Sequence, residues 1–107
     1  MIKRIVRLTF HHDKTEDFLL IFQNNKEKIA AFQGCTHLEL WRDTKQSYVF
    51  FTYSYWESEA ALNAYRHSEL FQKVWAKTKV LFSEKPQAWS VELLYNSSQP
   101  HDMKSKE

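Results

Sequence analysis

A chain of 107 residues, 43% hydrophobic and 26% charged, has the size and composition of one globular domain, which excludes most large enzyme architectures. Its single glycine excludes the glycine-rich loops that hold nucleotide phosphates, and its single cysteine excludes an intramolecular disulfide. A net charge of +2 is too small to indicate nucleic-acid binding. Because no long apolar run suggests a signal peptide or membrane span, we expect a cytoplasmic protein that contacts no membrane.

Hydrophobic periodicity and turn residues divide the chain into strands and helices. In chain order, the predicted elements are a strand over 2–10, a helix from Asp13 that ends before Gly34, strands over 35–42 and 48–56, a helix from Ser58 through Tyr65, a helical segment from Ser68 to about Lys79, and a strand over 88–95. Residues 1–95 form the predicted domain, and residues 96–107 have the composition of a frayed polar tail.

Particular residues mark the predicted helix ends. Asp13 is expected to cap the first helix, while Glu16, three residues on, reaches back toward it. Gly34 stands where a left-handed residue would end that helix. Ser58 and Ser68 are the predicted N-caps of the two later helical segments.

The order of strands and helices is that of the ferredoxin-like split βαβ plan, an α+β fold with helices on one face of an antiparallel sheet. The helices can cover only one face, yet the strand over 48–56 has Phe50 on one side and Val49, Phe51, Tyr53 and Tyr55 on the other. Each large side chain left in water forfeits roughly 1.5–3 kcal/mol relative to burial, so such a patch indicates an interface. We therefore expect a homodimer that forms through the sheet faces.

Histidine and cysteine are the first candidates for chemistry, because histidine titrates near neutral pH. His37 is expected on the mixed side of the second strand, together with Cys35, Glu39 and Trp41, and His67 in the kink between the helical segments. Each could reach a pocket under the helices, although an ordinary hydrogen-bonded or surface histidine is the simpler interpretation. We expect no metal site, since the adjacent His11 and His12 point apart on an extended chain. Cys35 has no activating base beside it and is expected to be a small buried thiol.

Aromatic residues provide a stronger indication. Trp56, Tyr65 and Trp75 fall at a strand end and on the two helical segments that follow, so they could converge on one cavity between helices and sheet. Such a cavity suits a flat, conjugated small molecule, with Arg7 or His37 meeting a developing oxyanion. The alternative is that these rings simply fill the core.

The segment Tyr55-Trp56-Glu57-Ser58-Glu59-Ala60-Ala61-Leu62, followed by Tyr65, Ser68 and Phe71, resembles the antibiotic biosynthesis monooxygenase domain family. Gly34-Cys35 ahead of a strand fits the same pattern, and the resemblance covers about residues 1–95. It implies a dimeric α/β barrel made of two ferredoxin-like subunits. It also implies either an oxygenase that acts on quinol-like or polyketide aromatics without metal or flavin, or a member of a branch that binds and degrades haem.

The chain departs from both branches at the positions that matter. Haem-degrading relatives have an asparagine, a tryptophan and a haem-ligating histidine where this sequence has Val6, Tyr65 and Trp75, so haem degradation is the less favoured activity. Quinol-oxidising relatives tend to have a glutamate and two histidines where this chain has Ser54, Tyr65 and Leu70. Any acid-base groups must then come from elsewhere, such as His37 or His67.

The leading hypothesis is a monooxygenase without cofactors that acts on a small phenolic or hydroquinone-type aromatic and O₂. Its expected catalytic residues are His37, His67 and Tyr65, and its expected substrate-binding residues are Trp56, Trp75 and Arg7. One alternative is a non-catalytic binding or stress-related protein with the same dimeric barrel. Another is an RNA-binding domain of the same strand order, which the absence of glycine from residues 45–48 disfavours.

Overall fold

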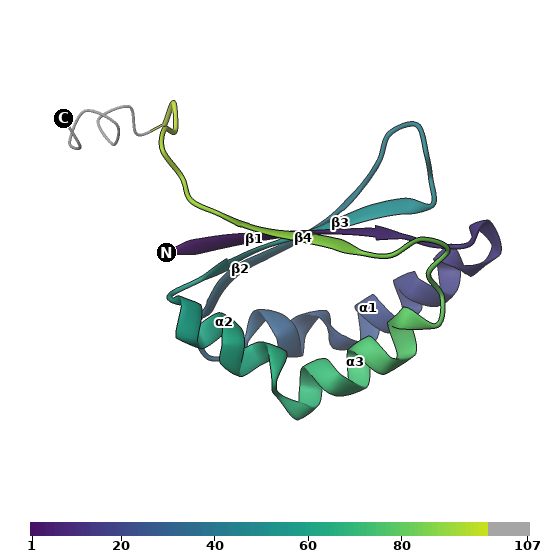
Figure 1. The fold of residues 1–107 in the computed structure, drawn as a ribbon, viewed down its shortest axis with the longest axis horizontal. Coiled ribbons are helices and arrows are strands. Elements are labelled where there is room, and N and C mark those ends of the chain that lie inside the picture. The colour runs from purple at the N-terminus through teal and green to yellow at the C-terminus, as the bar shows by residue number, and fades with distance from the viewer. Residues whose placement is uncertain (99–107) are drawn as a thin grey trace.

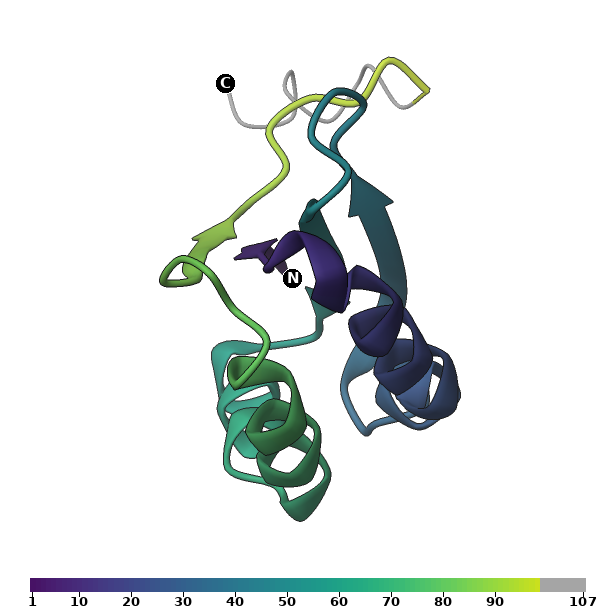
Figure 2. The same ribbon diagram turned by 90° about the vertical axis from the view of Figure 1, so that its right-hand side faces the viewer.

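The computed structural model describes residues 1–98, and its centre is a four-stranded antiparallel sheet with all of its helices on one face (Figure 1). The strand order is β2-β3-β1-β4, which is the ferredoxin-like arrangement that the sequence predicts. The strands are β1 (Ile2–Thr9), β2 (Cys35–Arg42), β3 (Val49–Trp56) and β4 (Gln87–Val91), and the helices are η1 (His12–Lys14), α1 (Thr15–Ala30), α2 (Glu59–Arg66) and α3 (Glu69–Lys79). Seen from the end of the sheet, α1 lies beside α2 and α3 in one layer (Figure 2).

The first helix begins differently from the sequence-based expectation. Asp13 lies inside the short 3-10 helix η1, and α1 starts at Thr15 with Lys14 in the N-cap position and no side-chain capping bond. The backbone N–H of Lys14 donates to the carbonyl oxygen of His11 at 2.9 Å, so a turn of a different kind has already formed at Asp13. The prediction that Asp13 caps α1 was therefore wrong.

Gly34 has the left-handed conformation that its position suggested, with φ of +92°. It does not cap α1, however, because that helix ends at Ala30 and Gly34 lies four residues later in the turn before β2. A Cβ atom at residue 34 would lie 2.5 Å from the Cβ of Ala61 on α2. Glycine is thus required twice over, by backbone conformation and by the close approach of this turn to α2.

The two later helical segments begin where the sequence predicts. The Ser58 hydroxyl accepts a hydrogen bond from the Ala61 N–H at 3.1 Å, and the Ser68 hydroxyl accepts one from the Phe71 N–H at 3.1 Å. Each serine thereby satisfies one of the free N–H groups at a helix start. The interruption at His67 turns one long helix into two shorter ones, α2 and α3.

The last strand is shorter than the expected span of 88–95. β4 ends at Val91, which lies opposite Lys3, and β1 itself begins at Ile2. Residues 93–95 consequently have no part of β1 to pair with, and the chain leaves the sheet on the side opposite the helices (Figure 1). Leu93, Leu94 and Tyr95 are all exposed.

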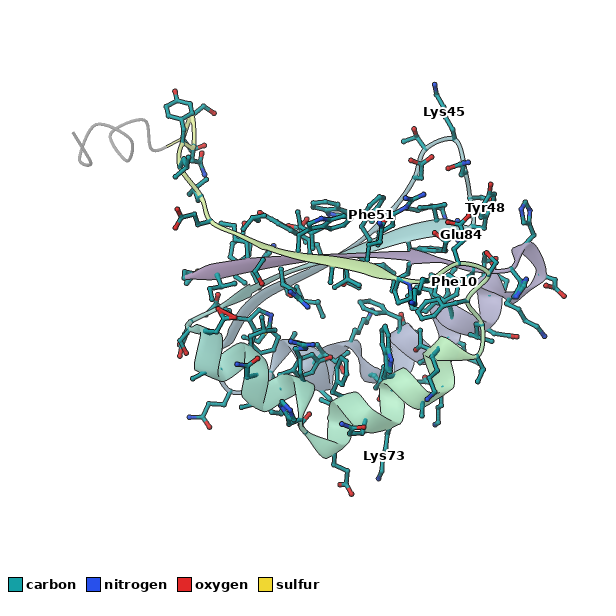
Figure 3. All side chains as sticks on the ribbon, in the orientation of Figure 1. Phe10, Lys45, Tyr48, Phe51, Lys73 and Glu84 are labelled. Carbon is teal, nitrogen blue, oxygen red and sulfur yellow. The ribbon has the colours of Figure 1, made fainter. Side chains whose placement is uncertain are left out.

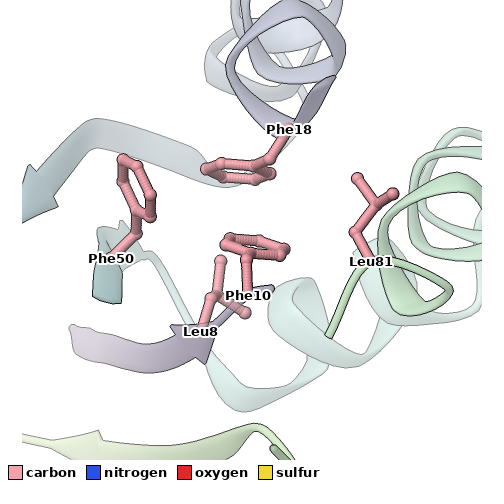
Figure 4. Packing of buried hydrophobic residues seen from close by; sticks show 5 residues of the cluster. All are labelled: Leu8, Phe10, Phe18, Phe50 and Leu81. Atoms are coloured by element: carbon pink, nitrogen blue, oxygen red, sulfur yellow. The ribbon is translucent and has the colours of Figure 1, made fainter. Parts of the chain in front are cut away.

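A phenylalanine-rich core fills one end of the layer between sheet and helices (Figure 4). The Phe10 ring stacks on Phe18 of α1 at 4.4 Å, and Phe18 contacts Phe50 of β3 at 5.1 Å. Leu8 and Leu81 complete the buried cluster. This end of the layer is closed, which leaves the other end available for a cavity.

Candidate functional site

Strand register divides the sheet into two faces with different side chains. In an antiparallel ladder, directly opposed residues lie on the same face, and successive residues alternate. Arg4, Val6 and Leu8 of β1 oppose Ser54, Thr52 and Phe50 of β3 on the face toward the helices, which we call the inner face. The other face carries Phe51, Tyr53 and Tyr55, and we call it the outer face; Figure 3 shows Phe51 on the side of the sheet away from the helices.

A cavity of about 340 Å³ lies between the inner face and the helices. All four strands and all three α-helices contribute to its lining, which is mostly apolar and aromatic. This volume is near the lower end of the range typical of small-molecule sites, roughly 300–1,000 Å³. The cavity is therefore large enough for a small organic ligand.

Trp56 and Tyr65 form a stacked pair in the lining. Trp56 is the last residue of β3 and is almost fully buried, and its indole N–H donates to the Ser54 hydroxyl at 2.9 Å. Its ring stacks on Tyr65 of α2, with centroids 4.9 Å apart and planes inclined by 26°. Because the N–H is satisfied and the ring is packed, the orientation of Trp56 is fixed before any ligand arrives.

Trp75 contributes to the lining from α3. It stacks on Phe71 at 5.6 Å with an interplanar angle of 12°, and Phe71 contacts Tyr65 edge-on at 5.2 Å. The structure thus brings together the three aromatic residues that the sequence placed at one cavity, Trp56, Tyr65 and Trp75.

The Tyr65 hydroxyl is a hydrogen-bond donor under ordinary conditions. Burial, together with the nearby Cys35, raises its pKa well above the usual tyrosine range. A tyrosine in this environment stays protonated at neutral pH and donates a hydrogen bond, so it cannot act there as a general base.

Cys35 lies on the inner side, in contrast to its expected place beside His37. A β-bulge between Cys35 and His37 inserts Thr36 as an extra residue, so Cys35 opposes the buried Trp56 while His37 opposes Tyr55. Burial raises the pKa of the Cys35 thiol, and the thiol donates a hydrogen bond to the His37 carbonyl oxygen at 3.6 Å. The residue is a partly buried neutral thiol, in keeping with its expected structural role.

His37 and Arg7 lie on the outer face and do not reach the cavity. The His37 ring contacts Tyr55 at 4.8 Å and pairs with the Glu39 carboxylate, which also accepts the Trp41 indole N–H at 2.7 Å. Arg7 donates to the side-chain oxygen of Gln87 at 3.4 Å. Neither side chain is in the cavity lining, so neither is placed to meet an oxyanion there.

His67 also lies apart from the cavity. It occupies the C-cap position of α2, is exposed, and its Nδ1 lies 2.8 Å from the carbonyl oxygen of Asn63. Of the six residues expected to form the site, the structure places Trp56, Tyr65 and Trp75 in the lining and His37, His67 and Arg7 outside it.

Two arginines that sequence reasoning passed over line the cavity, Arg4 of β1 and Arg66 of α2. Arg4 donates to the Ser90 hydroxyl of β4 at 3.0 Å. The alternation of side chains along β1 could have indicated Arg4, because residues two and four positions apart on a strand share a face and Arg4 therefore lies with Val6 and Leu8. Nothing comparable indicated Arg66, since the sequence does not show how far α2 is rotated about its axis.

Other kinds of site find no support among residues 1–98. No three histidine, cysteine, aspartate or glutamate side chains gather there as a metal would require. Within the same residues, no helix is both long and apolar enough to cross a membrane.

Comparisons with known proteins concern both sequence and fold. The profile of the family described as Antibiotic biosynthesis monooxygenase matches residues 1–77, from β1 into α3. No curated protein matches the chain.

Solved structures with the same fold come from several bacteria. A structure from Nitrosomonas europaea whose name carries the same family description has a TM-score of 0.82 at 18% identity, covering 89% of this chain and 100% of that one. One from Caulobacter crescentus, named likewise, has a TM-score of 0.80 at 19% identity, with coverages of 86% and 88%. A protein of unknown function from Bacteroides thetaiotaomicron has a TM-score of 0.74 at 14% identity, with coverages of 84% and 96%. At these identities the likeness concerns the fold alone.

Proposed function

The chain belongs to the antibiotic biosynthesis monooxygenase family, and we propose that it is a cofactor-independent monooxygenase for a small phenolic or hydroquinone-type aromatic. The observation that carries this proposal is the cavity of about 340 Å³ lined by the Trp56–Tyr65 stack and by Trp75. Flat aromatic side chains bind a flat aromatic ligand through offset or edge contacts of their rings. The cavity has the size for one or two fused rings.

The chemistry needs little from the protein. An ionised hydroquinone is electron-rich enough to reduce O₂ by one electron, and recombination then forms a bond between a ring carbon and oxygen. The resulting hydroperoxide loses water and leaves a hydroxyquinone, so one oxygen atom stays on the ring and the other departs as water. The protein has to orient the ring, shield it from solvent and donate a hydrogen bond, and the protonated Tyr65 hydroxyl is suited to the last task.

The test is an oxygen-dependent product. Purified protein is incubated with a panel of benzo- and naphthohydroquinones, in air and under anaerobic conditions, and the masses of the products are determined by mass spectrometry. We expect a product one oxygen atom heavier than the corresponding quinone, formed only in air and faster than in buffer alone. Trp75→Leu should slow its formation, while Lys79→Gln, an exposed change on α3, should not. Equal rates with and without protein would contradict the proposal.

The functional unit is proposed to be a homodimer that forms through the outer faces of two sheets. Trp41, Phe51, Tyr53 and Tyr55 make successive ring contacts along this face, from Trp41–Phe51 at 6.5 Å to Tyr53–Tyr55 at 5.2 Å. Trp89 and Val91 of β4 extend the same face and are exposed. A contiguous aromatic surface of this kind favours a second copy of the chain as its cover. Light scattering should give twice the mass of 12.9 kDa, and a monomer mass at micromolar concentration would contradict the dimer.

One observation favours a second candidate, a non-catalytic protein that binds an aromatic molecule. Among the residues that the structure describes, the cavity lining contains no histidine, aspartate or glutamate, so this lining offers no general base near neutral pH. The two candidates differ in the experiment above, because a binding protein would quench its tryptophan fluorescence with a ligand and give no oxygen-dependent product.

A further inference from the structure

We propose that the cavity takes an aromatic anion, whose carboxylate or phenolate oxygen is bound by Arg4 and Arg66. This proposal deepens the proposed function by naming the substrate class, and it concerns the same cavity. It rests on where these two side chains lie and on which charges face them.

Both guanidinium groups belong to one end of the cavity. Arg4 opposes Ser54 of β3 and Ser90 of β4, next to the position of Trp56 at the end of β3. Arg66 of α2 lines the same cavity and lies near enough to Arg4 for the two positive charges to repel each other. A ligand ring beside Trp56 and Tyr65 would therefore have its polar substituent within reach of one or both arginines.

The charges around this end are unbalanced. Arg4 and Arg66 are the charged side chains of the lining, and no carboxylate accompanies them there. The ion pairs within residues 1–98 are Lys14–Asp17 and His37–Glu39, so neither arginine lies within 4 Å of an acidic group. Among residues 1–98, the side-chain hydrogen-bond partner of Arg4 is the neutral hydroxyl of Ser90.

The electrostatic environment of Arg4 favours the binding of an anion. Its pKa is lowered, first by burial and next by the positive charge of Arg66, while Glu59 acts in the opposite sense. The Arg4 guanidinium keeps its proton at any ordinary pH, so its repulsion with Arg66 remains in the folded protein, although Arg66 is exposed and water screens part of that repulsion. An anion placed between them would offset that repulsion, and a carboxylate fits a guanidinium with two parallel hydrogen bonds.

The absence of a base from the lining selects the same class of ligand. A neutral hydroquinone has to lose its proton to solvent before it reacts, because the described part of the lining has no group to take that proton at neutral pH. An aromatic acid, or a phenol acidic enough to be ionised in solution, arrives already charged. The two arginines and the missing base thus favour the same substrate class.

The experiment compares two ligands of the same shape that differ in charge. Binding of 2-naphthoate and of its neutral isostere 2-naphthamide is measured by tryptophan fluorescence and by calorimetry. We expect the naphthoate to bind about 10-fold or more tightly than the amide, since hydrogen bonds to charged groups are the stronger ones. Its affinity should also fall with added salt.

Two variants locate the effect. Arg4→Gln and Arg66→Gln should each remove most of the preference for naphthoate and leave the affinity for naphthamide within about twofold. Lys79→Gln, which removes an exposed charge from α3, should leave both affinities unchanged. Circular dichroism verifies that each variant is folded, and the wild-type comparison of the two ligands needs no variant.

The outcomes separate this proposal from the proposed function. Equal affinity for the two ligands, absence of naphthoate binding, or a preference that survives both arginine substitutions would overturn the anion site. If naphthoate binds in an arginine-dependent manner and no hydroquinone or hydroxylated naphthoate gives an oxygen-dependent product, the anion site stands and the oxygenase proposal fails.

Discussion

The inner and outer faces of the sheet are made by alternate residues of the same strands, yet they differ in almost every physical respect. On β3, Ser54 and Trp56 are buried and joined by a hydrogen bond, and they border the cavity. Their neighbours Tyr53 and Tyr55 are only partly buried and contact other rings on an open surface. One position along a strand therefore separates the side chains of the proposed ligand cavity from those of the proposed dimer interface.

The largest expected effect comes from replacing one tryptophan on each face and comparing the losses in the free energy of unfolding. Trp56→Ala removes a buried ring and should lower the free energy of unfolding by about 3–5 kcal/mol. Trp41→Ala removes a ring that is 39% exposed and should cost about 1 kcal/mol in dilute monomer. Urea unfolding measures both, and similar losses would mean that the two faces are not energetically distinct.

A charge on the outer face should act on association and spare the cavity. Tyr53→Lys should raise the dimer dissociation constant by about 30-fold or more, equivalent to about 2 kcal/mol, because the ammonium would be buried against its symmetry mate. Leu20→Lys, at a highly exposed position on α1, is the matched control and should leave the dimer intact. Sedimentation gives the dissociation constants. Loss of naphthoate binding by the Tyr53 variant would show that the faces are coupled.

Alkaline pH should distinguish a tyrosine on one face from those on the other. The raised pKa of Tyr65 keeps its hydroxyl neutral in the folded protein, whereas in the unfolded chain it ionises near pH 10. Its contribution to stability is therefore present below pH 10 and is lost as the pH rises further. Between pH 10 and 11, wild type should lose about 1 kcal/mol more than Tyr65→Phe does.

On the outer face, a hydrogen bond between the phenols of Tyr53 and Tyr55 shifts their two pKa values in opposite directions. Hydrogen bonding to Tyr55 raises the pKa of Tyr53 to about 12, and hydrogen bonds from Tyr53 and Lys3 lower the pKa of Tyr55. Absorbance titration should detect Tyr55 ionising in the folded protein before Tyr65 does. Because the chain has five tyrosines, the Tyr55→Phe variant should lose the amplitude of one tyrosine from this early signal, and an undiminished amplitude would contradict the assignment.

The smallest expected effect concerns the reactivity of Cys35. Its raised pKa and partial burial should slow its alkylation by a maleimide about 10-fold at pH 8, relative to the chain unfolded in urea. A Lys45→Cys substitution in a Cys35→Ser background puts a thiol in the exposed hairpin loop and should react at the unfolded rate. Equal rates for Cys35 and this control would mean that Cys35 does not lie on the inner side.

Much of this fold could be predicted from local patterns, because alternation, helical spacing and serine caps are properties of neighbouring residues. The strand order and the starts of α2 and α3 followed from these patterns. The prediction that Asp13 caps α1 failed because an acidic residue near a helix start fits a preceding 3-10 turn as well as an N-cap. Sequence spacing does not distinguish these two positions.

The candidate site could be predicted only in part. Trp56, Tyr65 and Trp75 were found because bulky rings at a strand end and on helices must pack under the sheet. Arg7 and His37 were misplaced because they were chosen for their chemistry and not for the face that alternation gives them. Alternation assigned Cys35 to the wrong face because β2 has a bulge at Thr36, and the pattern of apolar residues does not reveal that bulge.

The bulge at Thr36 also bears on how long β2 needs to be. Cys35 opposes Trp56 and His37 opposes Tyr55, which are consecutive residues of β3. Thr36 therefore has no partner of its own in the ladder, and a β2 without it could form the same pairs. Deleting Thr36 would join these two pairs without moving any other, whereas a deletion farther along β2 would exchange the faces of every residue on one side of it. A one-residue gap at this point in a related sequence would therefore be compatible with an unchanged cavity and an unchanged outer face.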